Sequence, residues 1–338
     1  MSFRSICFAL WALTAQLCLA APLPKLEVGL IKRSEAGPQI GGANFPDPSI
    51  IQVNGVWYAF ATRTIGSSLH IQIATSPDFN TWTIVRNSDG SQKDALPNLP
   101  SWVNAASPNT WAPDLIQIDN TFVMYYSATT AQNTAQHCVG AATSNSITGP
   151  FTPVGNGALI CPTSQGGAID AAGYWEAATG QRYITYKVDG NSQGHGGACG
   201  NNVAPYVATP IILQAVANDG YTLQGSPTTI LNNNGAADQG IVEAPSLTKV
   251  GSIYILFFSS GCFTTGSYNV NYATSSSITG PFTRASSPLF ATGNYGLNTP
   301  GSADIFRDGK HMLFHANSAS GRALYTAQIT VNGNTVSA

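Results

Sequence analysis

The chain has 338 residues, of which only 9% are charged, and its formal net charge is −2 at pH 7. Such a chain lacks the basic surface that attracts nucleic acids or anionic membranes, so we expect neither as a partner. Glycine and tyrosine are frequent, with 34 and 13 residues, which suits short strands, tight turns and an uncharged polar ligand.

The N-terminus has the pattern of a secretion signal. Arg4 provides a positive charge, and an apolar run over residues 6–19 is too short to span a bilayer. The dibasic pair Lys32-Arg33 indicates a second cleavage site, with an exposed basic tail as the alternative. We predict a secreted, extracellular protein with a signal peptide at residues 1–20, a pro-segment at 21–33 and one domain at 34–338.

Four cysteines follow the predicted signal peptide, namely Cys138, Cys161, Cys199 and Cys262. An even number in an exported protein predicts two disulfides, for which three pairings exist. Because Cys138 and Cys161 are close enough to close a local loop, we predict that they pair. This pairing leaves Cys199 for Cys262. The cysteines do not have the spacing of a zinc site.

A hairpin pattern recurs along the mature chain. Residues 48–58, 113–123 and 245–255 each begin with proline and read as an apolar strand, a turn and an aromatic-rich strand. Two further hairpins surround Thr179-Gly180 and Asp308-Gly309. Units of roughly 55 to 75 residues with about four strands each are typical of propeller blades. We therefore predict an all-β fold, a five-bladed β-propeller, in a monomeric protein.

Three acidic residues occupy related places in these repeats. When the proline-led repeats are aligned, Asp47 lies one residue before the proline, Glu243 lies two before it, and Asp170 falls at or next to the same place. The innermost strands of a propeller surround one axis, so these acids should meet. Glycoside hydrolysis needs one ionised and one protonated carboxyl, and a third acid can raise the pKa of the proton donor. Each acid alone would also fit a turn or a strand cap.

Four segments resemble, in order, the motifs of glycoside hydrolase family 43. They are Phe45-Pro-Asp-Pro-Ser-Ile-Ile51, Trp111-Ala-Pro-Asp114, Ala168-Ile-Asp170 and Val242-Glu-Ala-Pro-Ser246, and the resemblance runs from Asn44 to Leu324. It implies a five-bladed propeller that inverts the anomeric carbon, with Asp47 as general base, Glu243 as general acid and Asp170 as the residue that tunes and positions Glu243. Family members act on arabinofuranosides, xylosides, arabinan or β-1,3-galactan.

Further residues are candidates for substrate contact. Trp111 would stack on a sugar face, and Phe45 belongs to the first motif. Arg322 resembles an arginine late in the family's chain and would contact substrate hydroxyls. His315 resembles a family histidine at the axis, where some members hold a calcium or sodium ion, and a core histidine is the alternative. No cofactor is expected to be required. Asp114 is expected to cap its own strand.

These features predict a hydrolase of plant cell-wall polysaccharide or oligosaccharide. An α-L-arabinofuranosidase acting on arabinan or arabinoxylan is the first choice, and a β-xylosidase or exo-β-1,3-galactanase of the same family is the alternative. A propeller lectin would keep the aromatic residues but would not need three converging acids. A retaining sucrose or fructan hydrolase would hold its two carboxyls closer together.

Overall fold

The computed structural model describes residues 37–64 and 66–338. The predicted signal peptide and pro-segment lie outside these residues. Within them the regular structure consists of β-strands and short 3₁₀ helices, with no α-helix. No helix in the described residues is long and apolar enough to cross a membrane.

Five antiparallel sheets follow one another along the chain. Blade 1 contains β1 (Ser49–Val53), β2 (Val56–Thr62), β3 (Ile71–Ser76) and β4 (Thr83–Ile84). Blade 2 contains β5 (Trp111–Ile118), β6 (Thr121–Thr129), β7 (His137–Ser144) and β8 (Thr152–Pro153). Blade 3 contains β9 (Ala168–Glu176), β10 (Gln181–Val188), β11 (Ile211–Val216) and β12 (Leu223–Leu231).

The last two sheets complete the series. Blade 4 contains β13 (Val242–Val250), β14 (Ile253–Ser260), β15 (Asn269–Ser275) and β16 (Thr283–Arg284). Blade 5 contains β17 (Gly301–Ile305), β18 (His311–Ser318) and β19 (Gly321–Gln328), followed by the hairpin β20 (Thr330–Asn332) and β21 (Thr335–Ser337). The 3₁₀ helices are η1 (Ile40–Gly42), η2 (Thr163–Gln165), η3 (Gly190–Gln193), η4 (Gly235–Asp238) and η5 (Asn294–Gly296).

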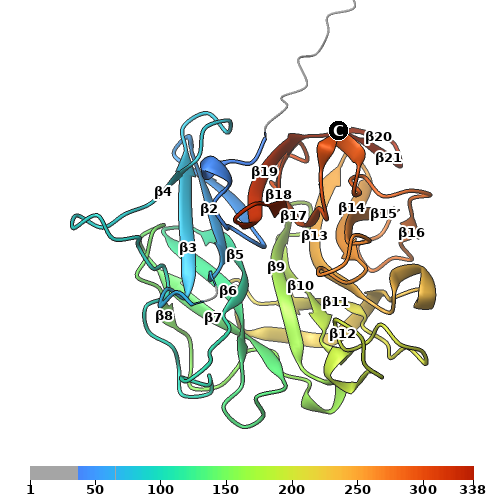
Figure 1. The fold of residues 1–338 in the computed structure, drawn as a ribbon, viewed down its shortest axis with the longest axis horizontal. Helices are drawn as coiled ribbons and strands as arrows, with labels where there is room; N and C mark the ends of the chain where they lie inside the picture. Colours follow the sequence, from blue (N-terminus) through green and yellow to red (C-terminus); the bar gives the residue numbers. More distant parts are fainter. Residues whose placement is uncertain (1–36, 65) are drawn as a thin grey trace, which may run out of the picture. The chain divides into compact units, whose positions relative to one another are not determined.

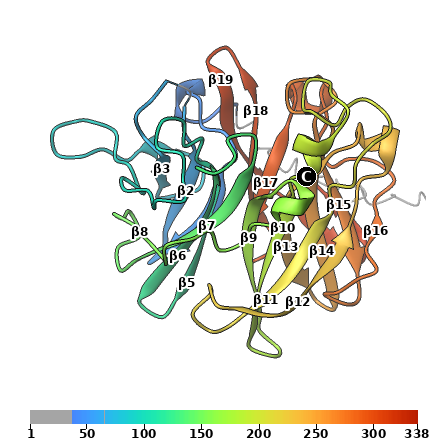
Figure 2. The same ribbon diagram turned by 90° about the horizontal axis from the view of Figure 1, so that it is seen from below.

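The first strand of every blade lies nearest to a common axis. β1, β5, β9, β13 and β17 contact one another in sequence order, and β17 contacts β1 to close the ring. Figures 1 and 2 show the blades following one another around this axis, from the blue first blade to the red last one. The predicted five-bladed β-propeller is therefore confirmed.

The N-terminal segment supplies the outer edge of blade 5, which has only three strands of its own. The Gln39 N–H donates to the Leu324 carbonyl at 2.8 Å, and the Phe45 N–H donates to the Arg322 carbonyl at 2.8 Å. Both acceptors belong to β19. The beginning of the described chain is thus bonded to its last blade.

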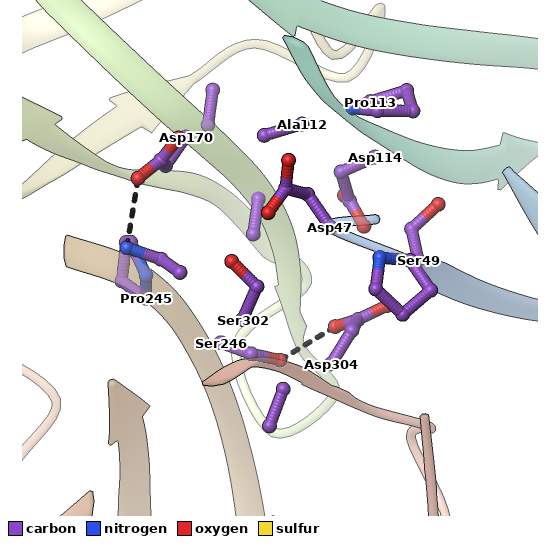
Figure 3. A pocket seen from close by; sticks show the side chains of 15 residues that line it. Asp47, Ser49, Ala112, Pro113, Asp114, Asp170, Pro245, Ser246, Ser302 and Asp304 are labelled. Carbon is purple, nitrogen blue, oxygen red and sulfur yellow. Dashed lines mark hydrogen bonds between the residues drawn. The ribbon is translucent and has the colours of Figure 1, made fainter. Parts of the chain in front are cut away.

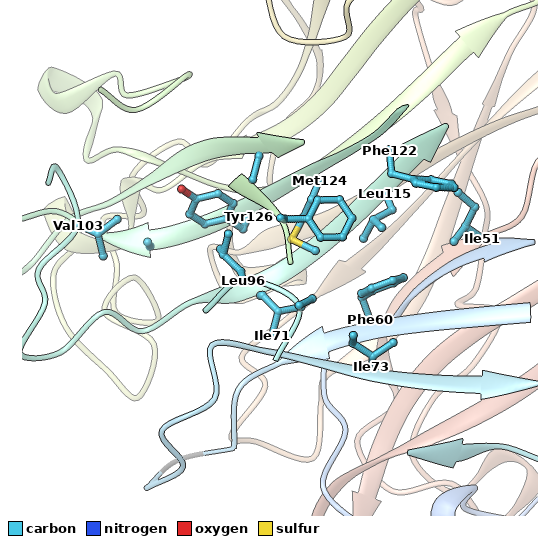
Figure 4. Close-up of a cluster of buried hydrophobic side chains, with 14 of the residues drawn as sticks. Ile51, Phe60, Ile71, Ile73, Leu96, Val103, Leu115, Phe122, Met124 and Tyr126 are labelled. Carbon is cyan, nitrogen blue, oxygen red and sulfur yellow. The ribbon is translucent and has the colours of Figure 1, made fainter. Parts of the chain in front are cut away.

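Apolar side chains fill the space between neighbouring blades. Five hydrophobic clusters each draw residues from two adjacent sheets. Between blades 1 and 2, for example, Ile51 and Phe60 pack with Leu115, Phe122 and Met124 (Figure 4). Each fully buried side chain of this kind stabilises the fold by about 1.5–3 kcal/mol, so the blades are held together mainly by these interfaces.

Both predicted disulfides are present. Cys138 pairs with Cys161, and Cys199 pairs with Cys262. The first joins β7 to the loop that follows blade 2. The second joins the loop after β10 to the loop after β14, so it links blade 3 to blade 4. The predicted pairing is confirmed.

Candidate active site

One backbone feature recurs near the start of every innermost strand. Asp47, Ala112, Asp170, Ala244 and Ser302 all have positive φ, between 42° and 57°. Such values are uncommon for residues other than glycine. In blades 2 to 5 the strand pairing shifts at this point, as it does at a β-bulge. We call these five the bulge residues, and they align the blades residue by residue.

This alignment fixes the places of the three acids. Asp47 and Asp170 are both bulge residues and are therefore structurally equivalent. Glu243 lies one residue before the bulge residue of blade 4, at the place that Trp111 occupies in blade 2. The sequence repeats had left the position of Asp170 uncertain by one residue. The backbone places it level with Asp47.

The amide N–H of each bulge residue is bonded to a side chain of the preceding blade. In four cases the acceptor is on the second strand of that blade. The donor and acceptor pairs are Ala112 to Thr62 Oγ1 at 2.8 Å, Asp170 to Ser127 Oγ at 3.0 Å, Ser302 to Ser259 Oγ at 2.8 Å and Asp47 to His315 Nδ1 at 3.1 Å. In the fifth case the Ala244 N–H donates to Asp170 Oδ2 at 2.9 Å. These bonds satisfy donors that would otherwise be unpaired, and they fix the acids relative to one another.

Asp47 is held as a carboxylate. Arg322 Nη1 donates to its Oδ1 at 2.8 Å, and Thr62 Oγ1 donates to its Oδ2 at 2.6 Å. Burial acts to raise the pKa of Asp47, but the Arg322 charge and the bonds it accepts hold that pKa well below its usual range. Asp47 is therefore ionised throughout the pH range in which proteins work, as a general base requires.

Asp170 and Glu243 form a second, different acidic group. Glu243 accepts hydrogen bonds from Lys187 Nζ at 2.9 Å and from the Tyr268 hydroxyl at 2.7 Å. Burial, and next the charge of Glu243, raise the pKa of Asp170 to about 8, against the opposing influence of Lys187. Two acids that interact this strongly titrate as a pair. At neutral pH the pair therefore retains one proton.

The sequence predicts Glu243 as the proton donor and Asp170 as the residue that tunes and positions it. In the structure the raised pKa is that of Asp170, and burial is its main cause. The Lys187 ammonium lies 2.9 Å from Glu243 Oε2. Glu243 stays the predicted proton donor.

A small cavity of about 40 Å³ lies on the axis beneath the acids. Its lining consists of the bulge residue of each blade and the two residues that follow it (Figure 3). Asp47 and Asp170 line this cavity, whereas Glu243 is not among its lining residues. The three acids therefore lie around one axis, but Glu243 is set beside the cavity and not in it.

Asp114 and Asp304 also line this cavity, each two residues after the bulge residue of its blade (Figure 3). Asp114 Oδ2 accepts from the Gly173 N–H at 2.7 Å, and Asp304 Oδ2 accepts from the Ile50 N–H at 2.7 Å. Burial, joined by the charge of Asp304, holds the pKa of Asp114 well above its usual value. Asp114 was expected to cap its own strand. Instead it bonds blade 2 to blade 3, as Asp304 bonds blade 5 to blade 1.

The prediction that Phe45 contacts substrate does not agree with the structure. Its side chain has 0% exposed surface and packs in the cluster between blades 1 and 5, with Trp57 and Leu324. The N-terminal segment is bonded to β19 through the Phe45 backbone, and this bond directs the Phe45 ring into the core. Phe45 is a core residue.

Trp111 and Arg322 lie beside the acids. Trp111 is half-buried and stacks on His137 with 3.9 Å between ring centroids, so one of its faces is already covered. Arg322 is bonded to Asp47, and its guanidinium also lies 5.0 Å from the ring centroid of Phe263, a residue with 40% exposed surface. The two residues can thus contact a ligand only with the surfaces that these partners leave free.

His315 is fully buried, and its Nε2 has no hydrogen-bond partner among the described residues. Because Nδ1 accepts the Asp47 N–H, we assign the ring proton to Nε2. Burial lowers the pKa of His315, against the raising influence of Asp47, so the ring is neutral at neutral pH. In the described part of the chain no group of three or more His, Cys, Asp or Glu side chains could hold a metal ion. The calcium or sodium ion expected near His315 stays a prediction, and we derive no step through it.

Several residues around the acids were missed by the sequence analysis. Lys187 carried a usable signal, because a lysine inside the apolar run of β10 needs a buried partner. Thr62, Tyr268 and Phe263 carried none. Tyr268 and Phe263 come from the loop between β14 and β15, which the repeats do not align.

Comparison with known proteins agrees with this architecture. Residues 40–334 match the family model described as Glycosyl hydrolases family 43. The extracellular endo-α-(1→5)-L-arabinanase 1 of Bacillus subtilis is 28% identical over 321 residues, which cover 87% of this chain and 88% of that protein. An extracellular endo-α-(1→5)-L-arabinanase of Thermotoga petrophila is 33% identical over 113 residues, which cover 31% of this chain but only 22% of that protein. The crystal structure of a thermostable family-43 glycoside hydrolase has the same fold, with a TM-score of 0.72 over 89% of this chain and 95% of that one, at 20% identity.

Proposed function

Because the chain belongs to glycoside hydrolase family 43, a family of inverting enzymes, we propose that it hydrolyses α-L-arabinofuranosyl linkages of arabinan. The observation that carries this proposal is the difference between its two acidic groups. Asp47 is kept ionised by Arg322, whereas the pair Asp170 and Glu243 retains a proton. An inverting hydrolase needs both states at once. Arabinan is favoured as substrate because the two relatives described above are named as arabinanases.

In the proposed reaction Asp47 takes a proton from water as the water oxygen bonds to the anomeric carbon. The bond from that carbon to the leaving oxygen breaks, and Glu243 gives its proton to the leaving oxygen. The proton of the pair must therefore be on Glu243 when the bond breaks. Asp170 accepts the Ala244 N–H, so it positions the backbone next to Glu243. We expect about 6.5–9.5 Å between the carboxyls of Asp47 and Glu243, because a water must fit beside the sugar.

The surfaces left free around the acids suit a sugar. We assign the uncovered face of Trp111 and the exposed ring of Phe263 as stacking surfaces. Arg322 lies between the general base and Phe263, where a substrate hydroxyl would reach it. With its two disulfides the enzyme is proposed to act as a secreted monomer on plant cell-wall polysaccharide. Size-exclusion chromatography of the secreted protein tests the monomer.

An assay panel tests the substrate. Chromogenic α-L-arabinofuranoside, β-xyloside and β-galactoside are compared with linear arabinan, and the sizes of the arabinan products distinguish release of terminal sugars from internal cleavage. We expect arabinan and the arabinofuranoside to be hydrolysed, with the first product seen by NMR in the inverted configuration. Hydrolysis of the xyloside or galactoside alone would overturn the substrate, and a retained configuration would overturn the mechanism. Binding of arabinan without any hydrolysis would indicate a lectin.

A further inference from the structure

The second strands of the five blades carry one residue at an equivalent position. Each is paired with the residue just before the bulge residue of its own blade. These residues are Thr62, Ser127, Lys187, Ser259 and His315. Four of them accept the N–H of the next bulge residue, as described above. Lys187 cannot do so, because an ammonium group has donors and no acceptor.

Blade 3 replaces the missing bond in a different way. Asp170 accepts the Ala244 N–H. In the other four cases the N–H of the equivalent bulge residue donates to a side chain on the second strand of the preceding blade. Lys187 Nζ donates instead to Glu243 Oε2 at 2.9 Å, one residue earlier in the same strand. Two consecutive residues of blade 4 are thus held from blade 3. The other four blades show that ring closure needs only a hydroxyl or an imidazole at this position.

Burial of the charged Lys187 side chain costs free energy. Its side chain has 0% exposed surface, and its partners are Glu243 and, at 3.8 Å, Asp189 Oδ1. Lysine is rarely fully buried unless it is paired. Closure of the propeller does not require a lysine at this position. We therefore attribute the presence of Lys187 to its contact with the Glu243 carboxyl.

We propose that Lys187 is a positioning residue that fixes the Glu243 carboxyl for protonation of the leaving oxygen. This inference rests on the proposed function. Lys187 and Tyr268 each bond one oxygen of Glu243, so together they fix its plane. A carboxyl held in this way presents its proton in one direction, which is what proton transfer to a bound oxygen requires.

The charged groups around Glu243 determine the expected pH effect. Asp170 faces it from β9, Lys187 from β10 with Asp189 behind, and Tyr268 from the loop before β15. The neutral His315 of the neighbouring blade 5 stacks on Tyr268, and Asp47 acts on the same group at longer range. Among the described residues Lys187 is the only lysine or arginine within ion-pair distance of Glu243. Removal of its charge therefore favours the protonated form of Glu243, and the alkaline limb of the pH–rate profile should move to higher pH.

The chain offers a matched control for this test. Lys249 Nζ and the Tyr254 hydroxyl both bond to Glu176, which repeats the lysine, tyrosine and glutamate set of the site. Lys249 lies at the far end of the inner strand that begins with Val242 and Glu243. Lys249→Met therefore removes a similar ion pair away from the acids.

The test compares Lys187→Met and Lys249→Met with the wild type on two substrates, an arabino-oligosaccharide and an aryl arabinofuranoside with a strongly acidic phenol. For Lys187→Met we expect kcat on the oligosaccharide to fall at least about tenfold, with a smaller loss on the aryl substrate, which needs little protonation. The alkaline limb of the pH–rate profile of Lys187→Met should move to higher pH. Lys249→Met should keep both activities and the wild-type pH profile.

Two further variants keep the inference falsifiable if Lys187→Met does not fold. Lys187→Arg retains the charge and should keep the wild-type alkaline limb, whereas Lys187→Gln should show the upward shift. Equal losses on both substrates, with an unmoved limb, would reduce Lys187 to a structural role and overturn the inference. If the wild type hydrolyses neither substrate, the proposed function fails instead.

Discussion

Replacement of Asp170 by asparagine should stabilise the protein while it impairs catalysis. Asparagine imitates the protonated carboxyl, and its amide oxygen can still accept the Ala244 N–H. The pKa of Asp170 is raised from 3.8 to about 8, so the folded protein binds this proton more tightly than the unfolded chain does. The wild type therefore has its full stability below about pH 4, loses stability as pH rises through this interval, and levels off above about pH 8.

The size of the effect follows from the same shift. Each pH unit in the interval is equivalent to about 1.4 kcal/mol, so the upper limit at pH 7 is about 4 kcal/mol. Part of the Asp170 side chain is exposed, so water lowers the free-energy cost of ionising it in the folded protein. We therefore expect the asparagine variant to exceed the wild type by about 2–4 kcal/mol at pH 7, and by almost nothing at pH 4.

Urea unfolding of both proteins at pH 4, 6 and 8 measures this difference. Asp119→Asn is the matched control, because Asp119 is exposed and also has a positive φ, 50° against 57° for Asp170. The control should follow the wild type at every pH. A difference between Asp170→Asn and the wild type that stays constant from pH 4 to pH 8 would refute the reasoning, since Asp170 would then ionise as an ordinary surface carboxyl does.

Three further changes test the site. Asp47→Asn removes the proposed proton acceptor for water, so kcat should fall by about 10²–10⁴ with an unchanged circular dichroism spectrum; full activity would exclude Asp47 as the base. Glu243→Gln should impair hydrolysis of an oligosaccharide far more than that of an activated aryl arabinofuranoside, and equal losses would argue against proton donation by Glu243. Phe263→Ala removes an exposed ring beside Arg322, so KM for arabinan should rise several-fold while kcat changes little; an unchanged KM would place the sugar elsewhere.

The repeats were sufficient to predict the propeller, because each blade encodes the same hairpin in the same order. They also located Asp47, Asp170 and Glu243, since residues at equivalent places in a closed ring must converge. Arg322 was found through resemblance, but its bond to Asp47 depends on ring closure, which spans 275 residues and has no local signal. Phe45 was misplaced for a related reason. Its motif suggested the site, whereas pairing of its backbone with β19 turned the ring into the core.

Lys187 shows a different limit of prediction from the sequence. The break in the five-fold pattern is visible only once the strands are paired, because the second strands differ in length and their residues cannot be aligned by sequence alone. The 2.9 Å contact between Lys187 Nζ and Glu243 Oε2 depends on this pairing of strands in neighbouring blades.

The bond between the N-terminal segment and β19 has a consequence for biosynthesis. A ribosome makes Asp47 before the groups that hold its carboxylate and its amide, because Arg322 follows it by 275 residues and His315 by 268. Until these residues emerge, the nascent chain contains the proposed base without the groups that orient it. We therefore expect activity only after blade 5 has folded against blade 1, and a chain that terminates before Arg322 should lack it even if four blades had folded.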